Sequence, residues 1–353
     1  MKLGLPQPAE PVPAGRNVQA DQASYACLIP GDTLDGRFLI DRTLSIGGMA
    51  TIFQAADLQN KNRLVALKVP HATFASGIGS LSRFQREAEI GFRLNHLSIL
   101  KFVPIGPAQR ASYLVTELVD GCTLAQRLTA NEPLPEKEAL NIARLICEAL
   151  QYLHEQKVVH YDLKPGNVML CPDGSIRLLD FGLAQPLDTR RFSLFASAPA
   201  MGTPDYVAPE QIRRKSGRPA ADIYSLGAIL YEMLTGSVPF PGDDPFVIGS
   251  VRLTGDPPAP RKLNPNLSPQ AEEIVLHAMQ RNPARRYPTT AAMKTDLEAP
   301  DQVRVTGLCD RLQPSTPWKR ARRVIRWILV WCIVPVASQV LLYFWLWHHF
   351  AKH

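Results

Sequence analysis

The sequence contains few cysteines, and they are not arranged as a metal site or as a disulfide framework. Among its 353 residues, six cysteines are widely spaced and form no C-x-x-C pair. This spacing excludes a small zinc-binding or disulfide-rich scaffold and predicts free thiols in a reducing compartment. The sequence also has no internal repeat and no apolar run near its start, so we expect neither a repeat architecture nor a signal peptide.

The length and composition are sufficient for a large folded unit. The chain is long enough for one large or two ordinary domains, and 46% of its residues are hydrophobic, which is enough for a full core. Residues 1–35 differ, because prolines are frequent there and bulky apolar residues are rare. We expect a disordered tail over this range. A proline-rich docking ligand is the alternative, although a P-x-x-P motif with a basic anchor is lacking.

The most informative motifs lie in the middle of the chain. Residues 160–167 read HYDLKPGN, and residues 180–182 read DFG. Phosphoryl transfer from Mg-ATP needs one residue that orients the attacking hydroxyl and two that hold the metal. Asp162 would be the base, Asn167 and Asp180 the magnesium ligands, and Lys164 a point charge for the transferring phosphate. These motifs resemble the catalytic loop and DFG motif of the eukaryotic-type protein kinases.

This resemblance implies a glycine-rich loop upstream, where backbone N–H groups approach the phosphates of ATP. Residues 45–53 read SIGGMATIF between two expected strands. Ser45 and Ala50 replace two glycines of the family pattern, and Gly47 remains, with Gly48 beside it. The motif is weak, and a plain hairpin is the alternative.

The resemblance also implies a lysine in a strand and a glutamate on the helix that follows. Residues 65–68 read VALK, similar to the family's V-A-I-K, and residues 86–88 read REA within a helix expected over 81–94. Lys68 would contact the α- and β-phosphates, and Glu87 would be its ion-pair partner. For either residue alone, the alternative is an ordinary solvated charge.

A strand that ends near residue 118 resembles the segment that binds adenine. The backbone of Glu117 and Val119 would hydrogen-bond the adenine edge, and Thr116 lies at the position that borders the pocket behind it. An ordinary apolar strand is the alternative. The full set of nucleotide-binding residues implied by the resemblance is Leu44, Ser45, Gly47, Gly48, Ile52, Ala66, Lys68, Glu117 and Val119.

Residues 180–210 resemble an activation segment. They end in GTPDYVAPE, close to the G-T-P-x-Y-x-A-P-E of Ser/Thr kinases. By this resemblance, Thr203 hydrogen-bonds the catalytic Asp162 and Lys164 and lies beneath the acceptor residue. Two structural pairings are also implied: Glu210 with Arg286, and Asp222 with the backbone of the catalytic loop.

One residue departs from the family pattern in a way that concerns regulation. The family commonly has Arg before the catalytic Asp, where it pairs with a phosphate on the activation segment. Tyr161 stands there instead and cannot form this pair. We therefore hypothesise that activity does not depend strictly on phosphorylation of the activation segment.

The resemblance covers residues 36–299, roughly three quarters of the chain. It implies an α+β fold with two lobes, a small antiparallel β lobe with one helix and a large, mainly helical lobe. Apolar periodicity predicts helices of the large lobe over 135–153, 221–234, 269–279 and 290–298, the last with Thr289 or Thr290 as its cap.

The residues after 299 predict a membrane anchor. Residues 300–326 form a basic linker, and residues 327–347 contain no charge. Twenty-one helical residues span ~31 Å, about the thickness of a bilayer core, and Trp and Tyr residues stand near both ends. A buried core helix is the alternative.

Charge predicts the orientation of this segment. Five Lys and Arg residues lie within 319–326, whereas only Lys352 and three histidines follow the span. This places the kinase domain in the cytoplasm and residues 348–353 as a short tail on the far side. The family resemblance implies that the membrane is a bacterial inner membrane. The basic linker would contact anionic lipid, and helix–helix self-association is open. We expect no nucleic-acid partner, because no recognition motif accompanies the basic residues.

Together these features predict a single-pass membrane Ser/Thr protein kinase that uses ATP with Mg²⁺, or Mn²⁺ in its place. Its substrates would be proteins with Ser or Thr acceptors, itself included. Two alternatives stay open: a pseudokinase scaffold, favoured by Ser45, Ala50 and Tyr161, and a kinase-like small-molecule phosphotransferase, disfavoured by the ending of the activation segment.

Overall fold

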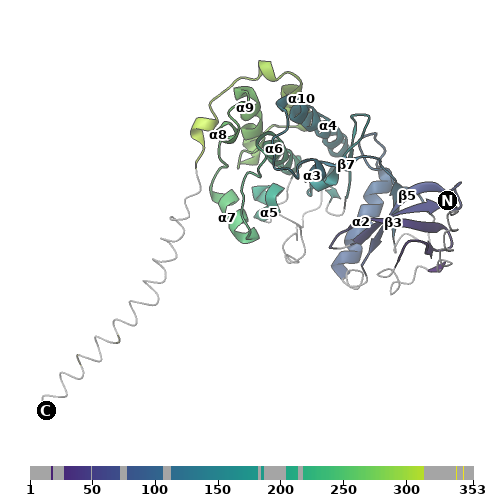
Figure 1. Ribbon diagram of the computed structural model, residues 1–353. Coiled ribbons are helices and arrows are strands. Elements are labelled where there is room, and N and C mark those ends of the chain that lie inside the picture. The colour runs from purple at the N-terminus through teal and green to yellow at the C-terminus, as the bar shows by residue number, and fades with distance from the viewer. Residues whose placement is uncertain are drawn as a thin grey trace, which may run out of the picture.

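A computed structural model shows two lobes of different composition (Figure 1). The residues that it describes are 17–18, 28–48, 50–71, 78–105, 113–181, 184–186, 204–213 and 218–313, together with the single residues Gln339 and Trp345. The small lobe contains the β-sheet, and the large lobe contains most of the helices. This arrangement confirms the expected small antiparallel lobe with one helix beside a large, mainly helical lobe.

The small lobe, in the residues that the structure describes, contains a six-stranded sheet and one helix. Its strands follow the chain order, and every neighbouring pair from β2 to β6 is antiparallel. Apolar residues that alternate along the strands, such as Phe38, Phe53 and Leu67, are buried and form the core of this lobe. The elements are β1 (Asn17–Val18), β2 (Thr33–Leu34), β3 (Phe38–Ile46), β4 (Ala50–Asp57), β5 (Arg63–Pro70), α2 (Ile78–Arg93) and β6 (Leu114–Glu117).

The large lobe is built around α6, a helix that is buried on nearly every side. Its sequence is apolar all round, which is typical of a central helix. Gly227 lets α6 approach α9 closely, because a Cβ there would lie 2.8 Å from that of Ala278. Gly236 ends α6 in the left-handed conformation at φ 72°. The principal helices are α4 (Glu136–Glu155), α6 (Pro219–Thr235), α7 (Pro245–Thr254), α9 (Pro269–Ala278) and α10 (Thr290–Glu298).

Short strands and helices lie in the segments that connect the principal helices. Small sheets form from β7 (Cys122–Thr123), β9 (Val168–Leu170) and β10 (Ile176–Leu178), and from β8 (Val158–Val159) and β11 (Gln185–Pro186). The short helices are α3 (Leu124–Arg127), α5 (Pro209–Ile212) and α8 (Pro260–Leu263), with 3-10 turns η3 (Pro165–Asn167), η5 (Pro204–Tyr206), η6 (Pro283–Arg285), η7 (Pro300–Gln302) and η8 (Cys309–Arg311).

The predicted helices of the large lobe agree with the structure to within two residues at each end. Thr289 caps α10 as predicted, since its hydroxyl accepts the N–H of Ala292 at 3.1 Å. The helix expected over 81–94 begins three residues earlier, at Ile78. Its first turns contain glycine and serine, whose weak helix propensity hides the true start from a pattern of apolar residues.

The N-terminal part of the small lobe begins earlier than the sequence predicted. Residues 28–35, assigned to a disordered tail by the sequence, instead pack on the small lobe: Leu34 is fully buried in β2, and Leu28 is buried nearby. Two isolated leucines among polar residues and glycines give too weak a pattern to predict this. Residues 1–16 and 19–27 lie outside the described residues, as does the expected anchor over 327–347 apart from Gln339 and Trp345. Within the described part of the chain, no helix is long and apolar enough to cross a membrane.

Candidate active site

The catalytic-loop residues predicted from the sequence converge around Asp162. Lys164 donates from Nζ to Asp162 Oδ2 at 2.8 Å. Asn167 donates from Nδ2 to the backbone carbonyl of Asp162 at 2.8 Å and to its Oδ2 at 3.2 Å. The side chain of Asp162 is one quarter exposed. The loop therefore holds one carboxylate in a fixed orientation and leaves it accessible to a reactant.

The backbone of the catalytic loop is hydrogen-bonded to Asp222 in α6 of the large lobe, as the sequence predicted. Asp222, fully buried in α6, accepts the N–H groups of His160 and Tyr161 at 2.9 Å each. His154 Nε2 of α4 lies 2.9 Å from the same carboxylate. Tyr161 has φ 61°, a left-handed conformation that costs free energy for a residue with a side chain. The hydrogen bonds that Asp222 accepts from the N–H groups of His160 and Tyr161 stabilise that conformation.

A second cluster joins the two lobes. Lys68 in β5 donates to both carboxylate oxygens of Glu87 in α2, at 2.7 and 2.8 Å. It also donates to Asp180 Oδ1 at 3.0 Å. Lys68 and Asp180 are separated by 112 residues and belong to different lobes. The ammonium is therefore positioned between an acid of the small lobe and an acid of the large one.

Burial and charge shift the proton affinities of this cluster. Burial raises the pKa of Glu87 to about 7, against the opposing effect of Lys68 and with a further upward push from Asp180. Burial also lowers the pKa of Lys68, but the carboxylates of Asp180 and Glu87 outweigh it and raise that pKa above its usual value. The lysine is therefore fully charged at neutral pH, and two acids share that one cation.

The residues of the DFG motif are oriented in opposite directions. Phe181 is fully buried and packs near His160 and Phe102, with ring centroids 5.6 and 6.5 Å apart. The Asp180 side chain is 40% exposed on the side of Lys68, and its φ is 58°. The buried phenyl ring thus anchors the turn that presents Asp180 to the site. Gly182 lies outside the described residues.

Asn167 and Asp180 fit the requirements of a hard divalent cation. The Asn167 amide uses its nitrogen toward Asp162, so its oxygen is the atom left for a cation. Asp180 offers carboxylate oxygens, and oxygen donors are what Mg²⁺ and Mn²⁺ prefer. In the described ranges, no three His, Cys, Asp or Glu side chains are grouped so that they could hold a metal by themselves. Phosphate oxygens would therefore be needed to complete the coordination.

The sheet brings together the residues expected to bind the nucleotide. Ile52 pairs with Ser45 on one side and with Lys68 on the other, and Ala66 pairs with Thr116. These residues are far apart in sequence, yet they form two neighbouring rows in the sheet. Ser45, Ile52 and Lys68 pair across β3, β4 and β5, and Ala66 and Thr116 pair across β5 and β6. Thr116 is buried at the end of the second row.

The turn between β3 and β4 is tight. The N–H of Gly47 donates to the carbonyl of Ala50 at 2.9 Å. A Cβ on Gly47 would lie 3.3 Å from that oxygen, so the turn favours glycine at this position. Leu44 lies in β3, the strand that leads into this turn, and Gly48 follows Gly47 in the turn itself.

The backbone of the expected adenine-binding segment is only partly available. The N–H of Glu117 already donates to the carbonyl of Lys101 at 2.9 Å. Its carbonyl, which accepts the Thr116 hydroxyl at 3.2 Å, is the group left for an adenine amino group. Val119 follows two residues later, outside the strand. This refines the expectation from the sequence, which did not separate the donor from the acceptor of Glu117.

The end of the activation segment is fixed in the large lobe. Arg286 donates to both carboxylate oxygens of Glu210 at 2.6 and 2.8 Å, and both residues are buried, which confirms the predicted pair. Gln211, which the sequence did not single out, donates from Nε2 to the carbonyl of Tyr161 at 3.0 Å. A glutamine directly after A-P-E at a helix start was the available signal. Thr203 lies outside the described residues.

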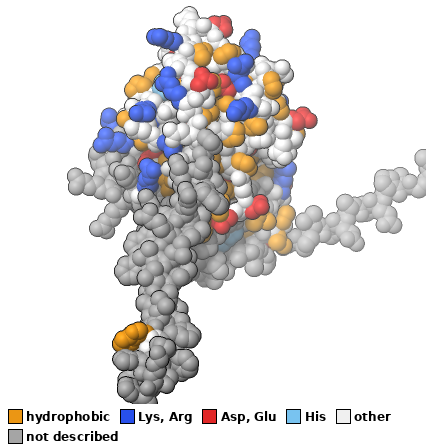
Figure 2. Space-filling model, turned by 90° about the vertical axis from the view of Figure 1, so that its left-hand side faces the viewer, with side chains coloured by type: hydrophobic (Ala, Val, Ile, Leu, Met, Phe, Trp, Pro, Cys, Tyr) orange, Lys and Arg blue, Asp and Glu red, His pale blue; other side chains and the backbone are white. Residues whose placement is uncertain are grey.

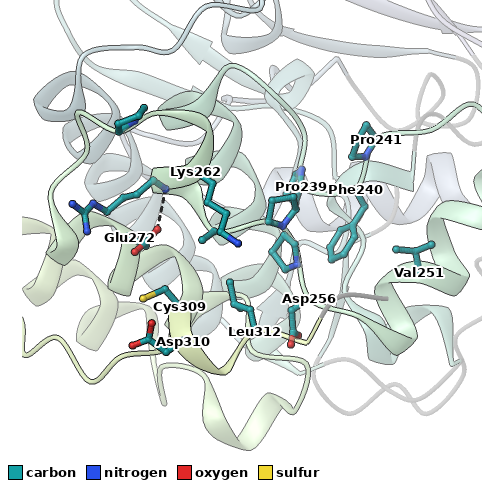
Figure 3. Close-up of a pocket in the computed structure, with 15 residues that line it drawn as sticks. Pro239, Phe240, Pro241, Val251, Asp256, Lys262, Glu272, Cys309, Asp310 and Leu312 are labelled. Carbon is teal, nitrogen blue, oxygen red and sulfur yellow. Dashed lines mark hydrogen bonds between the residues drawn. The ribbon is translucent and has the colours of Figure 1, made fainter. Parts of the chain in front are cut away.

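The described residues also line a cavity of about 900 Å³ that is partly open to solvent, but it is not this site (Figure 3). Its walls come from the loop before α7, the loop before α8 and the segment around η8. Lys68, Asp162 and Asp180 do not contribute to it. The cavity therefore belongs to the outer part of the large lobe and not to the catalytic groups.

Comparison with known proteins supports what this geometry indicates. Residues 38–297 match the family described as "Protein kinase domain". The chain is 35% identical over 282 residues to serine/threonine-protein kinase PknB of Mycolicibacterium smegmatis, covering 77% of the chain and 45% of the relative. It is 35% identical over 271 residues to serine/threonine-protein kinase PrkC of Bacillus subtilis (77% and 41%), and 36% identical over 266 residues to serine/threonine-protein kinase PknL of Mycobacterium bovis (75% and 66%). The match thus spans less than half the length of PknB and PrkC.

Proposed function

The chain belongs to the protein kinase domain family, and from this premise we propose that it transfers the γ-phosphate of ATP to Ser and Thr hydroxyls of proteins, itself included. The observation that carries the proposal is the complete pair of clusters around Lys68 and Asp162. One joins a cation to acids from both lobes, and the other holds an accessible carboxylate beside a second cation. A phosphoryl-transfer site needs both, because its catalysis is mostly positioning and charge stabilisation.

The residues divide the work between them. Glu87 fixes Lys68, which can then contact the α- and β-phosphates without losing its orientation. Asp162 orients the acceptor hydroxyl and takes its proton, while Lys164, 2.8 Å from it, neutralises charge that develops on the transferring group. When bound through Asn167 and Asp180, a divalent cation would neutralise the phosphate oxygens.

The preference for Ser and Thr follows from the resemblance around Lys164 and Thr203. Tyrosine-specific members of the family differ at both positions. The named relatives are all serine/threonine-protein kinases, which supports the same assignment. The pseudokinase alternative rested on Ser45, Ala50 and Tyr161, and the assembled clusters give it no support.

The decisive experiment is transfer of labelled γ-phosphate from Mg-ATP by the full chain, to itself and to myelin basic protein. We expect label on Ser and Thr in the wild type. This label should be lost in Asp162→Asn, because the variant has no carboxylate to take the proton of the acceptor hydroxyl. Asp173→Asn is the matched control, because Asp173 is an exposed acid in a nearby turn whose partner is Ser175. Absence of label from a folded, ATP-binding wild type would refute the proposal.

We also propose that residues 327–347 cross the membrane and that the kinase domain faces the cytoplasm at a bacterial inner membrane. The support is the uncharged run, the aromatic residues at its ends and the basic residues before it. The linker would then lie against anionic headgroups, and the span could associate with a second copy. On the face of the large lobe in Figure 2, basic and acidic side chains of the described residues are interspersed, so this face adds no patch suited to nucleic acid.

Membrane fractionation tests the anchor. We expect the full chain in the membrane fraction and a chain without 327–353 in the soluble fraction. Protease added to intact spheroplasts should leave the kinase domain undigested if it is cytoplasmic. Recovery of the full chain in the soluble fraction would refute the anchor.

A further inference from the structure

A fully buried arginine lies outside every motif used above. Arg252 in α7 has no exposed surface and is among the largest side chains that are completely buried. Burying a guanidinium is costly unless polar groups receive it. Burial accordingly lowers the pKa of Arg252 from its usual value, partly offset by Tyr224 and Asp205. Hydrogen bonds to the backbone compensate for the burial of this guanidinium.

The guanidinium bonds to the backbone on both sides of one residue. Its Nη2 donates to the carbonyl of Asp205 at 2.7 Å, and its Nη1 donates to the carbonyl of Val207 at 2.8 Å. Two parallel donors at fixed spacing are a property of arginine that lysine lacks. Arg252 therefore fixes the distance between two carbonyls of the same short segment.

The other face of this segment is held by α6. The hydroxyl of Ser225 donates to the carbonyl of Tyr206 at 2.8 Å, and the phenol of Tyr206 donates to Glu232 at 2.7 Å. The turn at 204–207 is thus clamped between α6 and α7, with Tyr206 bonded to one helix and its two neighbours bonded to the other.

An aromatic ring fixes the arginine itself. The guanidinium carbon lies 5.2 Å from the ring centroid of Phe240, within the range of a cation–π contact. Phe240 and Val251 stand in the wall of the cavity in Figure 3, and Phe240 is buried. The guanidinium of Arg252 therefore packs against Phe240 and donates to the backbone of the turn at 204–207.

We propose that Arg252 is a positioning residue for the protein acceptor: its two bonds set the shape of the turn at 204–207, which continues directly from Thr203, the residue expected beneath the acceptor. This rests on the proposed kinase function and adds to it a determinant of protein-substrate binding in α7. Arg252 lies in α7 of the large lobe, whereas Lys68 and the strands β3 to β6 that carry most of the expected nucleotide-binding residues lie in the small lobe (Figure 1), so it should affect the acceptor and not ATP.

Steady-state kinetics of the full chain tests this. In Arg252→Lys, which keeps the charge and loses the fork, the KM for myelin basic protein should rise about fivefold or more, with the KM for ATP unchanged. Arg252→Gln, which keeps one donor without a charge, should behave in the same way. Arg281→Lys is the matched control, because Arg281 bonds Asp256 and the Thr254 carbonyl at the end of α7 and does not touch the turn. Equal changes in the two KM values would overturn the proposal.

Hydrogen exchange gives a readout that does not need activity. We expect Arg252→Lys to speed deuterium uptake at the amides of 205–208 and to leave α6 and α4 unchanged, with Arg281→Lys unchanged at both. Unaltered uptake at 205–208, or an equal increase throughout the large lobe, would overturn the proposal. A wild type that phosphorylates nothing would instead refute the kinase function, and the exchange result would still decide whether Arg252 holds the turn at 204–207.

Discussion

Lys68 Nζ lies 2.7 Å from Glu87 Oε1, and this pair joins strand β5 to the only helix described in the small lobe. The same ammonium reaches Asp180 of the large lobe at 3.0 Å. One side chain therefore links the strand and helix of the small lobe to Asp180 of the large lobe. The first two predictions concern this cluster.

Replacing Lys68 with Met should lower phosphate transfer at least ~100-fold, because a preorganised charge on the phosphates is lost. The fold should survive, since Glu87 can remain buried as a neutral acid. The measurement is the rate of labelled phosphate transfer, with circular dichroism to verify the fold. Lys157→Met, at a turn away from the site, is the control. Comparable activity in Lys68→Met and wild type would contradict the assignment of Lys68.

Glu87 should make the stability of the ligand-free protein fall as pH rises. Its pKa in the folded protein is about 7, above the usual value, so the folded state binds the extra proton between about pH 4.5 and 7. By linkage the free energy of unfolding then decreases with rising pH across that window, by at most about 3 kcal/mol. Thermal unfolding from pH 5 to 8 measures it, against Glu87→Gln, which has no such group. Parallel profiles for the two proteins would show that Glu87 does not titrate there.

Asp222→Asn should destabilise the large lobe by about 2–4 kcal/mol, because one of two buried N–H groups would face an amide NH₂. Transfer activity should fall with it, since the catalytic loop loses its support. Chemical denaturation gives the free energy of unfolding. The exposed Asp173→Asn should change it by less than about 0.5 kcal/mol. An Asp222→Asn protein as stable as wild type would show that the carboxylate is not the support of the loop.

Replacing Thr189, Ser193 and Ser197 together with Ala should leave most of the activity. Tyr161, buried at the position where an arginine would receive a phosphate, has no cation to offer. The test is the transfer rate to myelin basic protein by the triple variant. Loss of activity from a folded triple variant would refute the hypothesis.

The sequence predicted contacts that depend on named motifs, including long-range ones. Glu210 and Arg286 are 76 residues apart, and their pairing followed from the motif at one end and the resemblance at the other. The buried helices followed from apolar periodicity, because packing in the large lobe agrees with local preference. Where both signals are present, sequence and structure coincide.

Contacts made by residues outside motifs were not predictable. Nothing adjacent to Arg252 indicates that it would reach the backbone at 205–207, because that contact exists only once α7 has packed against the turn. The same applies to His154 and Asp222, 68 residues apart. Leu34 was missed for a different reason: a two-residue strand is too short for periodicity to detect.

The support of the catalytic loop by Asp222 has a consequence for how a newly made chain becomes active. Lys68 and Glu87 pair within the small lobe alone, whereas Asp162 acquires its orientation only when α6 is packed inside the large lobe. A molecule still folding would thus bring phosphates to a site that has no base. Under the proposed function, phosphate transfer by this chain therefore requires a large lobe that is fully assembled, so a nascent or damaged copy would be inactive.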